Sequence, residues 1–187
     1  MKTATYKIEG VAPLYMHNGQ LADPLNKWAK LLKELSSKRK KTDADHEEMS
    51  RIEFLGGLYL DGDGHPCIPG ECIESMLISG AKAQKLGAHF KRFVFCPDAS
   101  CKLKYSGPKT AEGLWQDERF VSRVGARVGT ARVMRTRPYF EHWAVEFPVV
   151  YDELNKNDID SAVLEAGRSV GLMDWRPKYG RFNVVEE

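Results

Sequence analysis

Polar and apolar residues alternate in two long stretches of this chain, which is the pattern of β-strands with one buried side. Ala4, Tyr6 and Ile8 alternate with polar neighbours over residues 3–10, and a longer series runs from Trp143 to Tyr151. Shorter runs that predict further strands lie at residues 93–95, 102–105, 132–135 and 182–185. The pattern therefore predicts a sheet whose strands come from both ends of the chain.

Helical spacing of apolar residues marks the segments between these strands. Asp23 and Pro24 predict a helix start, with Asp23 as the cap, and the helix continues to about Ser36 with Trp28 on its apolar side. Thr42 or Asp43 caps a second helix that ends before Gly56 and Gly57. Further helices are predicted at residues 69–86 and 158–170, and a turn at residues 61–64 joins short apolar runs in a hairpin.

The order of these elements is strand, helix, strands, helix, strand. It predicts an α+β fold, specifically a ferredoxin-like (RRM-like) antiparallel sheet with helices on one face. We expect one domain over residues 1–187, with a helical insertion after the first strand at about residues 24–56. A chain of this length with 42% hydrophobic residues has enough apolar material for a core.

The composition limits the cellular setting and the chemistry. No apolar run reaches the length of a membrane span, and the N-terminus lacks an apolar signal core, so we expect a cytoplasmic protein with no membrane partner. The four cysteines are then expected to be reduced thiols. Their spacing lacks the two-residue knuckles of a zinc site, and Asp61–Gly64 lacks the later ligands of a calcium loop. We therefore expect no metal and no cofactor.

Positive charge is concentrated although the net charge is only +2. Residues 119–140 contain six arginines and no lysine or acidic residue. Arginine suits two-point contacts with phosphates and stacking on bases, so this segment predicts a loop or hairpin that holds a nucleic-acid strand. Alternatively, the arginines form a solvated surface paired with the acidic residues of segment 43–48. Lys40 and Lys41 extend the positive charge, and Tyr139 is placed to stack on a base or to pack in a strand.

The tail from Gly171 to Phe182 combines two glycines with aromatic and cationic residues. Glycine lets a backbone approach a ligand closely, and Trp175 beside Arg176 and Lys178 suits a flexible polyanion. The alternative is a tight turn between the last helix and the last strand, with the aromatic rings packed inside. The residues expected to contact RNA are Arg123, Arg127, Arg132, Arg135, Arg137, Tyr139, Trp175, Arg176, Lys178, Arg181, Lys40 and Lys41.

Three segments in order resemble the RAMP superfamily, the repeat-associated proteins of CRISPR systems, and most closely its guide-RNA-binding backbone subunits. They are Gly10–Asn18 leading to Asp23, His65–Gly70 before a helix rich in small residues, and the glycine-bracketed tail. The chain is also similar to a group of phage-encoded proteins with the same segments. The resemblance implies an RRM-like core that binds single-stranded RNA, with protomers assembling along the strand as a homo-oligomer or CRISPR-type complex.

Two other functions stay open at this stage. Some RAMP relatives cut RNA with an aspartate in the loop after the first strand. This implies a metal-dependent endoribonuclease that uses Asp23, with His17 as a possible general base. No phosphate-binding lysine loop, nucleophile elbow or zinc-protease motif occurs in the sequence. The third possibility is a phage protein that mimics or engages a CRISPR backbone subunit through protein contacts. We expect a non-catalytic protein.

Overall fold

The computed structural model describes residues 1–185, apart from the side chains of Val128 and Ala131. These residues form two compact units. Unit 1 contains Met1–Tyr15, Leu60–Ser106 and the chain from Phe140 onward. Unit 2 contains Met16–Tyr59 and Gly107–Tyr139. The helical insertion expected at residues 24–56 therefore lies in a unit that also contains a later segment of the chain.

Unit 1 is built on an antiparallel sheet with β1 (Lys2–Gly10) near its centre. β8 (Ala144–Tyr151) pairs along the whole of β1 on one side, and β9 (Phe182–Val184) pairs with its C-terminal end on the other. β4 (Val94–Phe95) and β5 (Ser100–Lys104) pair with the other edge of β8. β3 (Cys67–Pro69) pairs with β5, which gives the order β3-β5-β8-β1-β9. β2 (Leu14–Tyr15) is a short strand that follows β1.

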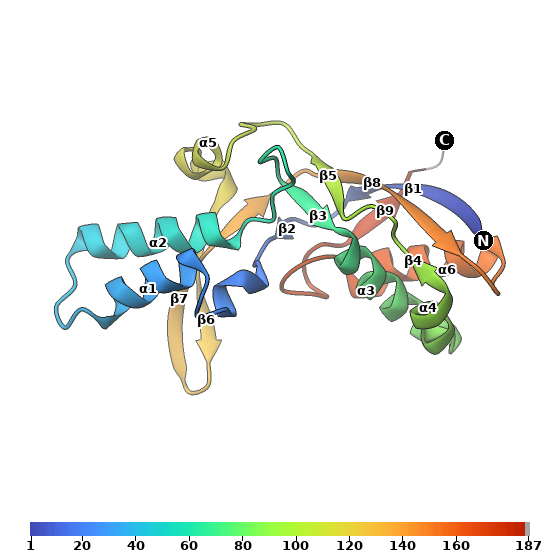
Figure 1. Ribbon diagram of the computed structural model, residues 1–187, viewed down its shortest axis with the longest axis horizontal. Coiled ribbons are helices and arrows are strands. Elements are labelled where there is room, and N and C mark those ends of the chain that lie inside the picture. The colour runs from blue at the N-terminus through green and yellow to red at the C-terminus, as the bar shows by residue number, and fades with distance from the viewer. Residues whose placement is uncertain (186–187) are drawn as a thin grey trace. The chain divides into compact units, whose positions relative to one another are not determined.

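Helices α3 (Gly70–Ala81) and α6 (Lys156–Glu165) cover one face of this sheet (Figure 1). The alternation seen in the sequence explains why, because Tyr6, Ile8 and Phe147 point to that face and are buried. A Cβ on Gly80 of α3 would lie 3.0 Å from the Cβ of Ala166, so the small residue lets the helical layer pack closely. A π-helical turn (η4, Ala166–Val170) continues α6.

The opposite face of the sheet is open. Thr5 and Glu146 are exposed there, and Lys7 of β1 lies directly opposite Glu146 of β8. Lys104 donates to the Glu146 carboxylate at 2.9 Å and forms an ion pair with it. That contact lowers the pKa of the Glu146 carboxyl. Within residues 1–185, β1 and β8 place no aromatic ring on this face. The central strands therefore lack the stacking rings that an RRM uses to bind bases.

Unit 2 contains two neighbouring helices and a β-hairpin (Figure 1). The helices are α1 (Lys27–Ser37) and α2 (Asp43–Gly57), and the hairpin strands are β6 (Val121–Val128) and β7 (Ala131–Phe140). The shorter elements are η1 (Gly19–Ala22), α5 (Ala111–Gln116) and η3 (Glu118–Phe120). Phe54 of α2 and Leu114 of α5 are fully buried in this unit.

Of the two predicted helix starts in unit 2, the start of α2 is correct and the start of α1 lies later in the chain than predicted. Thr42 caps α2, and Asp45 completes the capping box by accepting from the Thr42 backbone. α1 begins later than predicted, because Asn26 rather than Asp23 is its cap. α1 contains no buried residue, and Trp28 is half-buried beside Gly56 of α2.

In unit 1 the predicted helix 69–86 is shorter in the structure. α3 ends at Ala81, and η2 (Lys82–Gln84) follows before Lys85 adopts a left-handed conformation. A separate short helix, α4 (Gly87–Phe93), was not expected from the sequence. The predicted hairpin around residues 61–64 is reduced to one bridge between Leu60 and Pro66.

The fold is of the α+β class, as the sequence predicts. Over residues 1–185, every helix is too short or too polar to cross a membrane. All four cysteines are free thiols.

Candidate nucleic-acid interface

The β6–β7 hairpin presents the arginine-rich segment in unit 2. The two strands pair from Val121 opposite Pro138 to Val128 opposite Ala131. Gly129 has a φ of +60° at the first position of the two-residue turn, where a side chain would be strained. This turn closes the hairpin and fixes which arginines share a side.

The register divides the arginines between the two faces of the hairpin. Directly opposed residues point to the same side, so Arg127 and Arg132 share a face. Arg123, which lies opposite Thr136, belongs to that face as well, because it is an even number of residues from Arg127. We call the surface formed by Arg123, Arg127 and Arg132 the arginine face. Arg135 and Arg137 point to the other side, so the five arginines do not form the single surface that the sequence suggested.

All three side chains of the arginine face are exposed. Arg127 donates from Nε to the carbonyl of Gly129 at 3.2 Å. The aliphatic part of Arg132 lies over Gly125, whose Cβ would be 3.3 Å from Arg132 Cδ. In the described part of the chain, no carboxylate forms an ion pair with these arginines. Their guanidinium groups therefore remain available to an anion.

An aromatic ring lies at the base of the arginine face. The Arg123 guanidinium lies 5.6 Å from the centre of the Trp115 ring, and Trp115 packs on Phe54 with ring centres 5.5 Å apart. Trp115 is half-buried, so part of the indole remains accessible. Sequence reasoning missed this residue, because it lies in a helix of six residues that has no clear periodic pattern.

The β7 residues near the base of the hairpin are used for packing within unit 2. Glu53 of α2 is buried and accepts from the Thr136 backbone at 2.9 Å and from Arg135 at 3.2 Å. Arg137 is only 8% exposed, and this burial lowers the pKa of its guanidinium. These contacts anchor β7 to α2, and they are made by Glu53 rather than by the acidic residues 43–48.

A groove of about 530 Å³ lies between the two helices and β7. Leu32 of α1, Met49 of α2 and the hairpin residues Val133 and Met134 give it apolar walls. Met134 is 65% exposed. The hairpin therefore combines positive charge with uncovered apolar surface.

The remaining candidates in unit 2 lie outside the arginine face. Lys40 is exposed between α1 and α2, and Lys41 donates to the carbonyl of Lys38. Asp23 is exposed in the turn before α1, and its side chain accepts from the Leu25 backbone at 2.9 Å. The pKa of His17 is lowered by desolvation and by the nearby Arg137, which favours the neutral imidazole. Tyr139 is half-buried at the end of β7.

The glycine-bracketed tail is closed by contacts within unit 1. Leu172 N donates to Gly180 O, and Gly180 N donates to Pro13 O. Gly171 and Gly180 have φ values of +78° and +70°, and a Cβ on either would meet the backbone of the tail itself. These glycines allow two parts of the tail backbone to approach each other closely. This agrees with the tight turn considered as the alternative to an RNA-binding loop.

The aromatic side chains of the tail pack on β2, whereas two of its cationic side chains are exposed. Trp175 and Tyr179 each pack on Tyr15, with ring centres 4.7 Å apart. Arg181 is half-buried and donates from Nε to Pro177 O at 2.6 Å, whereas Arg176 and Lys178 are exposed. Of the tail residues expected to contact RNA, only these two therefore have exposed side chains.

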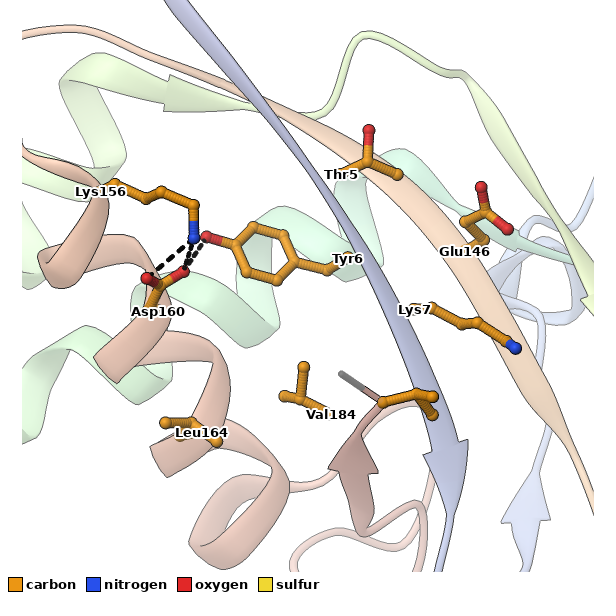
Figure 2. A pocket seen from close by; sticks show the side chains of 9 residues that line it. Thr5, Tyr6, Lys7, Glu146, Lys156, Asp160, Leu164 and Val184 are labelled. Carbon is orange, nitrogen blue, oxygen red and sulfur yellow. Dashed lines mark hydrogen bonds and ion pairs between the residues drawn. The ribbon is translucent and has the colours of Figure 1, made fainter. Parts of the chain in front are cut away.

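Unit 1 has a pocket of about 460 Å³ beside β1 (Figure 2). Asp160 of α6 accepts from the Tyr6 hydroxyl at 2.7 Å and from Lys156 at 2.8 Å. Burial and the Asp160 carboxylate raise the pKa of Tyr6. Since Lys156 and Tyr6 both donate hydrogen bonds to Asp160, we interpret this cluster as a structural contact between β1 and α6.

One group of possible metal ligands lies in the turn after Leu60. Single ligand atoms of Asp61, Asp63 and His65 come within 4.8 Å of one another. The Asp61 carboxylate already accepts from the backbone N–H groups of His65 and Asp63, and these bonds lower its pKa. The arrangement is the turn that the sequence predicts.

No protein-family model matches this sequence, and no curated protein matches it either.

Proposed function

We propose that this chain is a non-catalytic, single-stranded RNA-binding protein of the RAMP type, and that the arginine face holds the RNA phosphates. In this proposal Arg123, Arg127 and Arg132 contact phosphates, and Trp115 offers its ring to a base. Arg176 and Lys178 are proposed as separate phosphate contacts on unit 1. Arg135 and Arg137 are left out of this set. Arg135 forms an ion pair with Glu53, and Arg137 is buried.

The observation that carries this proposal is the position of Arg127 directly opposite Arg132. Like charges at opposed positions destabilise a β-hairpin, and no carboxylate of the described residues pairs with either side chain to offset the repulsion. A phosphate bound between the two guanidinium groups removes this repulsion and forms charge-assisted hydrogen bonds. The arrangement favours an anionic ligand over a bare solvated surface.

The proposed RAMP relationship includes a ferredoxin-like core in unit 1. It is supported by the sequence of elements β1, α3, β4 with β5, β8, α6 and β9, and by the antiparallel order β5-β8-β1-β9. Two of the three resembling segments also lie together, since Val11 N donates to Arg181 O and Asp174 N donates to Tyr15 O.

Fluorescence anisotropy with labelled oligonucleotides tests the binding proposal. At low salt we expect the protein to bind single-stranded RNA of mixed sequence and to bind more weakly as salt rises, because phosphate contacts release counterions. Duplex RNA is expected to bind more weakly, since its bases cannot reach Trp115. An absence of binding to single-stranded RNA at low salt would refute the proposal.

The non-catalytic part of the proposal has its own test. Asp23 is used in a turn, and the group of neighbouring metal ligands found in residues 1–185 does not include it. We expect labelled RNA incubated with magnesium to remain intact with the wild-type protein and with Asp23→Ala. Cleavage by the wild type that Asp23→Ala abolishes would instead establish a metal-dependent ribonuclease.

The exposed Met134 favours a second candidate function. Met134 shares the side of the hairpin that carries the arginine face, and with Leu32, Met49 and Val133 it lines the groove. Exposed apolar surface of this kind occurs at protein interfaces. In this alternative the hairpin engages an acidic and apolar protein partner, for example a CRISPR complex met by a phage mimic. A protein that fails to bind RNA at low salt but associates with a purified CRISPR complex through the hairpin would support it.

A further inference from the structure

Two buried thiols meet at the end of the unit 1 sheet. Cys96 follows β4 and Cys101 lies in β5, and their sulfur atoms are 3.8 Å apart. Cys96 is 8% exposed and Cys101 is 2% exposed. Among the four cysteines of the chain, this is the pair whose sulfurs lie within hydrogen-bonding distance in the described structure.

The surroundings hold Cys96 in place and polarise its sulfur. Its backbone N–H donates to Glu74 of α3 at 3.0 Å, and its sulfur lies 3.6 Å from the carbonyl of Asp98. The hydrogen bond from the Cys101 thiol lowers the pKa of Cys96, and the same contact raises the pKa of Cys101. The thiolate therefore forms first at Cys96, which is also the more exposed of the two residues.

The loop between the thiols is short and lies on the surface. Residues 97–100 are exposed, and the carbonyl of Ala99 accepts from Gly70 N at the start of α3. β4 and β5 pair with opposite ends of one edge of β8, so this loop connects two separate parts of the sheet edge. A covalent link across the loop would fix both strands together with the start of α3.

We propose that Cys96 and Cys101 form a reversible disulfide by exchange with small-molecule disulfides. The Cys96 thiolate attacks one sulfur of the disulfide, which releases one thiol and leaves a mixed disulfide on Cys96. The Cys101 thiol then loses its proton, and its sulfur attacks the neighbouring Cys96 sulfur and releases the second thiol. The short distance between the two sulfurs offsets the raised pKa of Cys101 in this step. The two cysteines lose two electrons and two protons, and the small disulfide gains them as two thiols. The sulfur atoms close from 3.8 Å to about 2.0 Å.

The other two cysteines serve as internal controls. Burial raises the pKa of Cys67 to about 11, and burial also raises the pKa of the half-buried Cys72. A thiol with a raised pKa reacts slowly with disulfides. We therefore expect both to remain reduced while the Cys96–Cys101 pair reacts.

The experiment incubates the folded protein with oxidised glutathione, blocks the remaining thiols and measures intact and peptide masses. The expected result is the loss of two of the four free thiols and two hydrogen atoms, with the bond mapped to Cys96–Cys101 and reversed by dithiothreitol. Cys72→Ser is expected to leave this bond unchanged, whereas Cys96→Ser is expected to prevent it. Four free thiols after incubation, a bond to Cys67, or glutathione retained on Cys96 would overturn the proposal. Peptide mapping of the wild type decides the question even when a serine variant folds poorly.

Discussion

Residues of one type have different roles in the unit 2 hairpin and its surroundings. Arg119 is bound by Asp117 at 2.6 Å, and Arg135 is bound by Glu53. Arg127 and Arg132 instead face each other across the hairpin. The sequence shows all of them as one arginine-only segment, because a linear pattern contains neither strand register nor the distant carboxylate partners. Whether an arginine of this segment can bind an anion therefore depends on its own strand position and carboxylate partner.

The repulsion between opposed arginines gives a prediction in which stability and binding change in opposite directions. Arg132→Thr is expected to raise the free energy of unfolding by up to about 1 kcal/mol in the absence of RNA, because a like-charge pair is removed. The same change is expected to weaken RNA binding. Urea denaturation and anisotropy measure the two effects.

The matched control for this change is Arg119→Thr, which removes an exposed arginine that has a carboxylate partner. It is expected to leave RNA affinity nearly unchanged and to leave stability equal or slightly lower. A stability loss in Arg132→Thr, with RNA affinity intact, would show that the opposed pair is not held for an anion.

Gly180 supports a prediction about the tail. Gly180→Ala is expected to lower the free energy of unfolding by more than about 2 kcal/mol, because the position has positive φ and the added Cβ meets the Leu172 backbone. Thermal or urea denaturation measures this loss. Gly62→Ala is the control, since its Cβ would meet no atom within 4 Å. Equal stability of the two variants would show that the tail does not depend on this close approach.

At the scale of elements, the local pattern predicts long strands and capped helices well. The alternation in β1 and β8 and the cap at Thr42 are confirmed, because each depends on neighbours in the sequence. β6 was not predicted as a separate strand, since its arginines and Gly125 favoured a loop or hairpin. The α1 start was displaced because Asn26 competes with Asp23 as a cap. Residue preference alone does not show which of two favourable cap residues, three positions apart, begins the helix.

The capping box of α2 gives a pH-dependent prediction. The hydrogen bond from Lys38, together with the Thr42 backbone, lowers the pKa of Asp45 to about 2. Its stabilising contribution is therefore present above the ordinary aspartate pKa and is lost as the pH falls towards 2. Asp45→Asn is expected to melt at a lower temperature than wild type at neutral pH, with the difference closing towards pH 2. A difference that stays constant over this range would contradict the assignment.

The hairpin itself can be shortened without changing its anchored part. Removing residues 126–133 and joining Gly125 to Met134 with Asn-Gly deletes Arg127 and Arg132 but keeps the pairs from Val121 to Gly125. This variant is expected to retain its circular dichroism spectrum and to lose most of its RNA affinity. Full affinity in a folded shortened variant would place the RNA elsewhere.

At the scale of the whole molecule, the two units contribute different features. Unit 1 has the sheet and its covering helices, and the central strands of its open face offer no aromatic ring within residues 1–185. Unit 2 has the arginine face and Trp115. The sequence predicts the elements of both, but not that residues 16–59 and 107–139 form one unit. That grouping depends on contacts between distant segments, such as Glu53 with Thr136, which local patterns do not encode.

The salt dependence of RNA binding tests the central claim most directly. We expect Arg127→Gln with Arg132→Gln to bind single-stranded RNA at least about tenfold more weakly and to lower the slope of log affinity against log salt by about 0.7 for each lost contact. The matched control is Arg119→Gln with Arg168→Gln, because both arginines are exposed and already paired with carboxylates. It is expected to keep the wild-type slope. Equal slopes for all three proteins would contradict the account.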